Sequence, residues 1–284
     1  MNLVHLNGEL LPAERAAISP FDRGFLYGDG LFETVRIYGG RAYLLDLHLE
    51  RLIDGLNYLR ISHPSGAELT ASIASLITAN AVTDAVLRLT ITRGIGGAVA
   101  EMEPGLRPTV LITVKPLLQS DGVPEQGETI ITLSARHTAP PIGRRLKTLN
   151  YLTAVFSAPE LAAADVREGL LLTEQGMVVE GTVSNMFCVV DGMLYTPPVT
   201  LGILPGITRG RVLELAHDAG ITTREQEFDR TMFAAADECF YTNSVRELVP
   251  IVRLDEQKIG DGTPGPVTQL LLAKYREGVV VGSW

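Results

Sequence analysis

The 284-residue chain contains only two cysteines, Cys188 and Cys239, which lie far apart in the sequence and outside any CxxC or Cys/His ligand spacing. Their scarcity argues against a disulfide framework and a zinc site, and it favours a reducing cytoplasm. No apolar stretch reaches the roughly 18 residues that a transmembrane helix needs. Residues 1–8 show neither a basic segment nor a long apolar run. We therefore expect a cytoplasmic protein that is neither secreted nor inserted in a membrane.

Positive charge is also in short supply. The 24 Lys and Arg residues are outnumbered by 33 Asp and Glu, which gives a formal net charge of -9 and a pI near 5.1. Nucleic acids are bound through clusters of Lys and Arg, so a nucleic-acid partner is disfavoured. In contrast, 46% hydrophobic residues supply enough material for the cores of two domains.

Several familiar catalytic motifs are missing. The glycine-rich stretch 94–97 lacks a following lysine at Walker spacing, and the sequence contains no GxSxG elbow. The five histidines form neither HExxH nor a clustered ligand set, so no metal site is expected. We interpret His48 as an ordinary helix residue.

Lysine is scarce enough for each one to be considered, because the chain has only four. Lys147 follows the basic pair 144–145 and opens the string KTLNYL. Neighbouring positive charge and partial burial both favour a neutral amine, which is the form that attacks an aldehyde. Lys115 comes immediately before the proline that opens a linker, Lys258 falls in a polar turn and Lys274 in a terminal helix, and we interpret all three as structural.

Two further features suit one cofactor chemistry. Glu180 follows the apolar run 177–179, which delivers its carboxylate into the interior, where it needs a partner such as a pyridinium nitrogen. Gly206, Ile207 and Thr208 open a helix, whose free N–H groups and dipole suit a phosphate. An amine, a buried carboxylate and a phosphate cradle are what a pyridoxal 5'-phosphate (PLP) enzyme requires.

The pattern along the chain predicts two domains. Hairpins are expected over 3–11 and 32–45, strands over 85–92 and 109–115, and helices over 46–59 and 67–80. Asp46 is the expected cap of the first helix, and Arg51 is expected to lie off its apolar stripe of Leu47, Leu52, Ile53, Leu56 and Leu59. Further on, hairpins are expected around 175–176 and 191–192, and helices over 151–164, 209–219 and 267–276. The predicted limits are a small domain over 1–115, a linker over 116–127 and a large PLP-binding domain over 128–284.

Six strings carry a resemblance to a known family, and they occur in the family's order: FDRGFLYGDG at 21–30, HLERL at 48–52, KTLNY at 147–151, EGTVSN at 180–185, GITR at 206–209 and TNS at 242–244. Over nearly its whole length the chain resembles the class IV, fold-type IV PLP enzymes. The resemblance implies an α/β (α+β) fold with a small N-terminal α/β domain and a larger C-terminal domain that has a β-barrel-like sheet flanked by helices. It also implies PLP as cofactor and a homodimer whose site lies between the domains.

The resemblance assigns roles to particular residues. Lys147 is the catalytic lysine, Glu180 pairs with the cofactor's ring nitrogen, and Tyr151 lies against its phenolic oxygen, although the spacing from lysine to tyrosine is commonly one residue longer in branched-chain enzymes. The phosphate is held by Arg51, Ile207, Thr208 and Ser244.

The expected substrate-binding residues are Tyr27 and Phe32, with Arg88 and Arg93 as candidate binders of a carboxylate. Alternation along residues 87–93 puts the two arginines on opposite faces, so they cannot readily serve one site. The sequence leaves both of them open.

The departures from the family patterns favour one member. D-amino-acid aminotransferases carry an Arg-x-His pair shortly after the Thr-Arg-Gly string, which is absent after Arg93. Branched-chain enzymes have Gly-Thr and then alanines where this chain has Asn243-Ser244-Val245-Arg246. Residues 19–28 and 242–247 instead resemble the aminodeoxychorismate lyases of the folate pathway, whereas 260–268 resembles the tail of branched-chain enzymes. We predict the lyase, acting on a small-molecule amine. An amino-acid transaminase is the alternative, and a non-catalytic PLP-binding protein is a third possibility.

Overall fold

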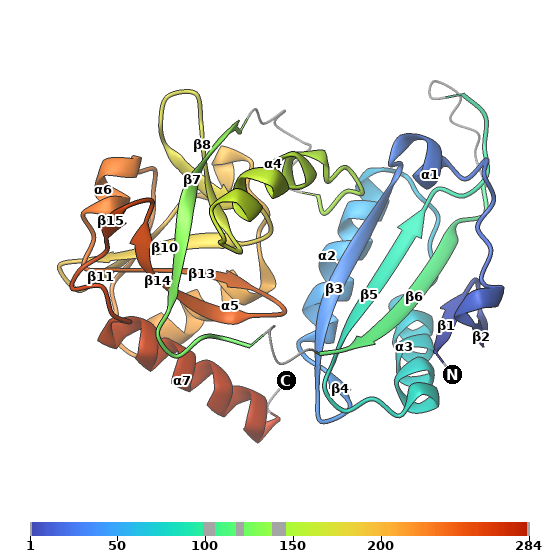
Figure 1. Cartoon of the computed structure of the whole chain (residues 1–284). Coiled ribbons are helices and arrows are strands. Elements are labelled where there is room, and N and C mark those ends of the chain that lie inside the picture. Colours follow the sequence, from blue (N-terminus) through green and yellow to red (C-terminus); the bar gives the residue numbers. More distant parts are fainter. Residues whose placement is uncertain (1, 99–105, 118–121, 138–145, 283–284) are drawn as a thin grey trace. The chain divides into compact units, whose positions relative to one another are not determined.

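A computed structural model describes residues 2–98, 106–117, 122–137 and 146–282 (Figure 1). The chain divides into two compact units, which we describe separately. The first unit is built from residues 1–119 and 146–150, and the second unit from 120–145 and 151–284. The predicted linker over 116–127 runs from the last residue of one strand to the residue before the next.

The first unit is an antiparallel six-stranded sheet with helices on it. The strand order is β2-β1-β6-β5-β3-β4. Its elements are β1 (Leu3–Leu6), β2 (Glu9–Pro12), the short helix η1 (Ala13–Arg15), α1 (Arg23–Tyr27), β3 (Gly30–Tyr38), β4 (Arg41–Ala42), α2 (Leu45–Tyr58), α3 (Gly66–Asn80), β5 (Ala85–Thr92) and β6 (Thr109–Pro116). The hairpins, strands and helices expected in this part of the sequence are confirmed within a few residues.

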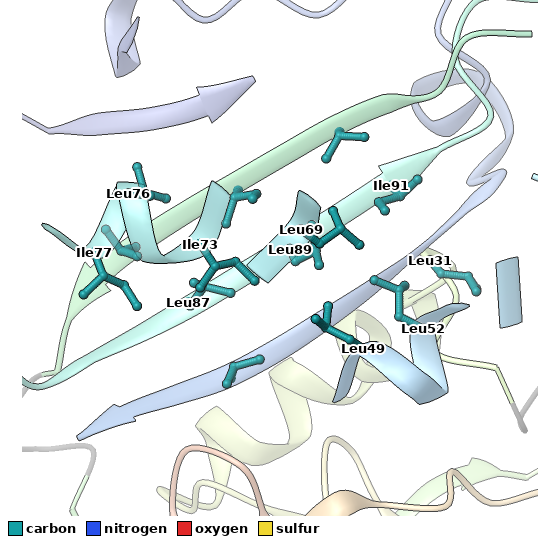
Figure 2. Packing of buried hydrophobic residues seen from close by; sticks show 14 of the residues in the cluster. Leu31, Leu49, Leu52, Leu69, Ile73, Leu76, Ile77, Leu87, Leu89 and Ile91 are labelled. Carbon is teal, nitrogen blue, oxygen red and sulfur yellow. The ribbon is translucent and has the colours of Figure 1, made fainter. Parts of the chain in front are cut away.

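The core of the first unit lies between α2, α3 and one face of the sheet. Figure 2 shows the leucines and isoleucines of α2 and α3 directed at those of β3 and β5. Alternation along β3 and β5 turns Leu31, Leu87, Leu89 and Ile91 toward the helices. Burial of each such side chain stabilises the fold by about 1.5 to 3 kcal/mol.

The buried face of α2 differs from the predicted stripe. Leu47 is 43% exposed, whereas His48 is only 2% exposed and Leu49 is part of the core. The helix begins after Leu44, which adopts a left-handed conformation, and no side chain caps it, so the expected cap at Asp46 is wrong. Gly55 allows α2 to pack closely on β3, because a Cβ at this position would lie 2.5 Å from Cδ1 of Leu31.

Residues 146–150 belong to the first unit, although the sequence-based limits assign them to the C-terminal domain. The N–H of Phe32 donates to the carbonyl of Lys147 (3.0 Å), and the N–H of Leu149 donates to the carbonyl of Gly30 (3.2 Å). Leu146 also packs on the core. Lys147 is therefore attached to the start of β3.

The second unit contains a curled, mixed sheet of nine strands (Figure 1). Its order is β12-β11-β10-β13-β14-β7-β8-β9, and β15 pairs with β14. The strands are β7 (Glu128–Arg136), β8 (Gly169–Leu172), β9 (Val178–Gly181), β10 (Asn185–Val190), β11 (Met193–Thr196), β12 (Thr223–Glu225), β13 (Glu238–Asn243), β14 (Glu247–Leu254) and β15 (Gln257–Lys258). The helices are α4 (Leu152–Ala163), the short η3 (Val199–Leu201), α5 (Ile207–Asp218), α6 (Arg230–Ala234) and α7 (Pro266–Val281).

The second unit has its own apolar core, to which β10 and β13 contribute Met186, Cys188, Cys239 and Tyr241. On the other face of these two strands the buried rings of Phe187 and Phe240 stack with centroids 4.8 Å apart. Cys188 and Cys239 are register partners on β10 and β13 and are free thiols, and burial raises the pKa of both. The three helices and two hairpins expected here are confirmed. Strands β7, β13 and β14 had no counterpart among the expected elements.

Candidate active site

Lys147 lies beside an aromatic side chain of the first unit. Its Nζ is 4.7 Å from the centroid of the Phe32 ring, and its backbone is hydrogen-bonded to the N–H of Phe32. The lysine is partly buried, whereas Phe32 is buried. The basic pair 144–145, which was expected to favour the neutral form of the Lys147 amine, lies outside the described residues. The aromatic neighbour gives the amine a partly apolar environment.

Arg88 lies against the same ring. Its Cζ is 3.7 Å from the centroid of Phe32, and cross-strand pairing puts Arg88 opposite Thr34 and Phe32 opposite Thr90. These side chains are on the face of the sheet that is turned away from α2 and α3. An exposed guanidinium close to the amine of Lys147 is suited to bind the carboxylate of a small molecule.

Arg93 is committed to other contacts. Its guanidinium donates to Asp29 (2.8 and 3.1 Å) and to the carbonyls of Leu59 and Arg60 (3.1 and 3.0 Å). Arg23 donates to the same Asp29. The structure thus distinguishes the two arginines that the sequence ranked equally. Arg93 is hydrogen-bonded to Asp29 and to the residues that follow α2, whereas Arg88 lies beside the Phe32 ring near Lys147.

A buried charge cluster lies on the helix-covered face of the same sheet. Glu33 on β3 accepts hydrogen bonds from Nε and Nη2 of Arg51 (2.8 and 2.7 Å) and is 2.6 Å from Nδ1 of His48. Burial alone would raise the pKa of Glu33, but Arg51 and His48 outweigh burial and hold the pKa at about 2. Burial lowers the pKa of His48, and the attraction to Glu33 offsets part of that effect.

This cluster corrects the interpretation of His48, which is not an ordinary helix residue because it is buried and paired. Arg51, the expected phosphate ligand, makes a bidentate ion pair with Glu33. The sequence feature that could have predicted this cluster is Glu33, which lies between Leu31 and Val35 on the buried face of β3. A carboxylate at such a position requires partners on the helix that covers it.

Glu180 is buried in the second unit, in β9, as its sequence neighbours predicted. Its Oε2 accepts a hydrogen bond from the N–H of Leu204 at 3.2 Å. Asn185 holds the same loop, because its Nδ2 donates to the carbonyl of Leu204 at 2.9 Å. The carboxylate is therefore tied to the segment that leads into α5.

The N-terminus of α5 provides donors for an anion. Gly206 is the N-cap residue, no side chain caps the helix, and its first turn contains no acidic residue. Thr208 is only 3% exposed. A Cβ on Gly206 would lie 2.1 Å from Oδ1 of Asn185, so only glycine fits there. Residues 204–208 thus connect Glu180 to a helix start that suits a phosphate.

The remaining predicted residues have less distinctive surroundings. Ser244 lies in the turn between β13 and β14, where Oδ1 of Asn243 accepts the N–H groups of Val245 and Arg246. Tyr151 is the N-cap residue of α4. Tyr27, at the end of α1, is 41% exposed and lies beside Arg23, with 5.2 Å between Cζ and the ring centroid.

In the described parts of the chain no group of three or more His, Cys, Asp and Glu side chains could hold a metal ion. The same residues include no helix that is long and apolar enough to cross a bilayer.

Comparison with known proteins identifies the family. The model of the class IV amino-transferases matches residues 30–254, which is most of the chain. The chain belongs to the class IV aminotransferases. It is a PLP-dependent enzyme with the mixed α/β architecture of fold type IV. An amine partly buried against a ring, a buried strand-end carboxylate and an uncapped helix N-terminus fit this cofactor.

Relatives of different activity are similarly distant from this chain. The aminodeoxychorismate lyase of Bacillus subtilis is 36% identical over 282 residues, which cover 98% of this chain and 94% of the relative. A Methanocaldococcus jannaschii protein provisionally named a branched-chain-amino-acid aminotransferase is 36% identical over 279 residues (96% and 95%). The D-alanine aminotransferase of Bacillus licheniformis is 33% identical over 267 residues (94% and 93%).

Solved structures are divided in the same way. The branched-chain amino acid aminotransferase of Escherichia coli superposes with a TM-score of 0.90 at 30% identity, covering 99% of this chain and 94% of the other. The 4-amino-4-deoxychorismate lyase of Pseudomonas aeruginosa gives 0.87 at 32% identity (97% and 98%). A further branched-chain enzyme with a TM-score of 0.89 at 29% identity (98% and 94%) was solved with pyridoxamine 5'-phosphate.

Proposed function

We propose that the protein is a 4-amino-4-deoxychorismate lyase, which releases 4-aminobenzoate and pyruvate for folate synthesis. The lyase-like strings at 19–28 and 242–247 support this assignment, as does the similarity to two proteins of that name. The observation that carries it is the way Arg246 is held. Arg246 donates to Glu128 (2.9 and 2.6 Å), to the hydroxyl of Tyr241 and to the carbonyl of Gly122 (3.1 Å).

This contact set matters because the branched-chain pattern usually has alanines at the positions of Val245 and Arg246. An alanine could make none of these contacts, so the turn that contains Ser244 is anchored here by a residue that departs from that pattern. We infer that the departure from the branched-chain pattern alters the site-forming turn itself.

In the proposed lyase reaction Lys147 is the base. When bound, PLP supplies an electron-withdrawing ring that accepts the electron pair left by bond breaking at the carbon bearing the substrate nitrogen. Lys147 takes the proton from that carbon. The C–O bond to the enolpyruvyl group then breaks and the substrate ring becomes aromatic. One proton leaves the ring carbon and one completes pyruvate, so no oxidant or reductant is needed.

Other side chains bind and orient. Glu180 holds the proton at the ring nitrogen, and Tyr151 contacts the phenolic oxygen. The phosphate is bound by Arg51, by the N–H groups of Ile207 and Thr208, and by the hydroxyls of Thr208 and Ser244. On the substrate side, Tyr27 and Phe32 provide aromatic walls, and Arg88 binds a carboxylate. Arg93 is the weaker candidate for that role, because Asp29 and two carbonyls already occupy it.

An amino-acid transaminase is the second candidate. The 36% identity to the provisionally named branched-chain relative and the TM-score of 0.90 support it, as does the branched-chain-like stretch at 260–268. In this reaction Lys147 would take the same proton, water would release the 2-oxo acid, and the amino group held by the cofactor would pass to a second 2-oxo acid. The missing Arg-x-His pair after Arg93 disfavours a D-amino-acid enzyme.

The deciding experiment combines two assays on the purified enzyme loaded with PLP. In the first, the visible absorbance is followed as single D- or L-amino acids are added without a 2-oxo acid. In the second, release of 4-aminobenzoate from aminodeoxychorismate is measured. The expected result is a visible band that persists with every amino acid, together with release of 4-aminobenzoate. Rapid bleaching of the band by one class of amino acid, without release of 4-aminobenzoate, would show that the enzyme is a transaminase and not the lyase.

Two variants complete the experiment. Lys147→Ala should abolish turnover and the visible band, and full activity would exclude both reactions. Arg88→Gln should raise KM by about 10- to 100-fold, because a charge-assisted hydrogen bond contributes about 1.5 to 3 kcal/mol. The expected homodimer is tested by sedimentation: a fully active monomer would contradict it. The cytoplasmic location remains a prediction.

A further inference from the structure

Glu168 is a buried carboxylate to which the sequence drew no attention. It is 2% exposed and lies immediately before β8. Its Oε1 accepts hydrogen bonds from the N–H of Gly169 (2.9 Å) and from the N–H and hydroxyl of Thr182 (2.6 and 2.5 Å). Its Oε2 accepts from the hydroxyl of Ser184 (2.7 Å) and the N–H of Val183 (3.4 Å). One carboxylate thus gathers five neutral donors.

Four of these donors lie in the turn that directly follows Glu180. The N–H of Gly181 closes this turn on the carbonyl of Ser184 at 2.7 Å. A Cβ on Gly181 would lie 2.2 Å from Oγ of Ser184 and 2.7 Å from Cδ of Glu168, so the turn is packed onto the carboxylate. The path of the chain immediately after Glu180 is therefore set by Glu168.

The other side of Glu180 is also fixed. Its carboxylate receives the N–H of Leu204, and Asn185, the residue after the turn, binds the carbonyl of Leu204. The turn at 181–184 therefore lies between two attachment points of the same site. If its path changed, Glu180 and Asn185 would both move relative to residues 204–206.

We propose that Glu168 is a positioning residue for Glu180, and that Thr182 and Ser184 belong to the EGTVSN string because they bind Glu168. The inference rests on the proposed role of Glu180 toward the cofactor's ring nitrogen. Glu168 itself acts through the turn and touches neither substrate nor cofactor.

Glu238 offers a matched control. It is 7% exposed, and its carboxylate accepts the N–H of Val267 (2.9 Å) and the N–H and hydroxyl of Thr268 (2.8 and 2.7 Å). A Cβ on Gly265 would lie 2.0 Å from its Cδ, which parallels the packing of Gly181 on Glu168. Glu238 holds the start of α7, so its loss should destabilise the fold without changing the turn after Glu180.

The test is a double-mutant cycle of E168A and E180Q, with E238A as control. For each variant, PLP is added to the apoprotein, and its dissociation constant, the visible spectrum of the bound cofactor across pH and kcat are measured. E180Q should alter the spectrum. E168A should alter it in the same direction and lower kcat by about 10- to 100-fold, as expected for misplacement of about 1 Å. The double variant should fall within about twofold of E180Q, because the two residues act through one carboxylate.

The outcomes separate the two claims. If E180Q leaves the spectrum unchanged, the role of Glu180 in the proposed function fails. If E180Q alters the spectrum but E168A resembles E238A, with lower stability and a normal spectrum, only the positioning role fails. If E168A does not fold, the double substitution T182V/S184A keeps the carboxylate and removes two donors. It should shift the spectrum in the same direction by a smaller amount, and an unchanged spectrum would overturn the inference.

Discussion

Glu33 in the first unit and Glu168 in the second are both buried carboxylates beside proposed site residues, but their partners differ in charge. Glu33 is held by the Arg51 guanidinium and by His48, whereas Glu168 is held by three N–H groups and two hydroxyls. A carboxylate balanced by a guanidinium makes its region sensitive to protonation and to loss of either partner. A carboxylate bound by neutral donors mainly fixes the path of the backbone. The first unit should therefore respond most strongly to charge, and the second to shape.

The largest expected effect follows from removing the charge balance in the first unit. Glu33→Ala leaves the Arg51 guanidinium and His48 without their carboxylate, and breaking such a buried pair costs about 3 to 5 kcal/mol. Urea unfolding of the apoprotein measures this loss. Glu214→Ala is the control, because Glu214 pairs with Arg211 on the exposed surface of α5, where a pair contributes at most about 1 kcal/mol. Equal losses in the two variants would remove the distinction between the buried cluster and a surface ion pair.

A second, somewhat smaller effect concerns acid. The pKa of Glu33 lies at about 2, below its usual value of 4.5. The folded state therefore binds this proton less readily than the unfolded chain, so the stabilisation is complete above pH 4.5 and is lost as the pH falls through about 2. The shift corresponds to about 3 kcal/mol.

The measurement is the free energy of unfolding of the apoprotein, followed from about pH 6 to about pH 2 for the wild type and Glu33→Gln. The wild type should lose its advantage over the variant in the acid range, and parallel curves would contradict the ion-paired state. The lowered pKa of His48 also destabilises the fold on acidification, beginning below pH 6.5, and His48→Gln separates that contribution.

These partners explain what the sequence could and could not predict. Lys147, Glu180 and the start of α5 lie in short strings whose local pattern already suggests their chemistry. A glycine turn flanked by apolar residues located β3, and runs rich in β-branched residues located β5 and β6. Apart from the hydrogen bond between Glu168 and the adjacent Gly169, the contacts of Glu33 and Glu168 join residues at least 14 positions apart, so no local pattern contains them. Arg88 and Arg93 looked equivalent for the same reason. The ion pair with Asp29 distinguishes Arg93 from Arg88, and Asp29 is 64 residues from Arg93 in the sequence.

Strands β13 and β14 illustrate a second limit. Both are almost continuously buried, so neither shows the alternation of a strand that has one buried and one exposed face. A run of apolar residues without a period does not distinguish a buried strand from a buried helix segment. The sequence therefore identified the TNS string, which overlaps the end of β13, without locating either strand.

The smallest expected effect tests whether shape governs the second unit. The variant is at the N-cap of α5 and its control lies within the helix. Gly206→Ala places a Cβ 2.1 Å from Oδ1 of Asn185, whereas Gly210→Ala, in the same helix, meets no atom within 4 Å. Gly206→Ala should destabilise the apoprotein by about 1 to 3 kcal/mol and weaken PLP binding. Gly210→Ala should stabilise the helix by about 0.5 to 1 kcal/mol and leave PLP binding unchanged. Because neither substitution changes charge, a loss of PLP affinity confined to Gly206→Ala would trace the defect to the geometry of the loop that joins Glu180 to α5, and equal affinities would remove that loop from the proposed phosphate site.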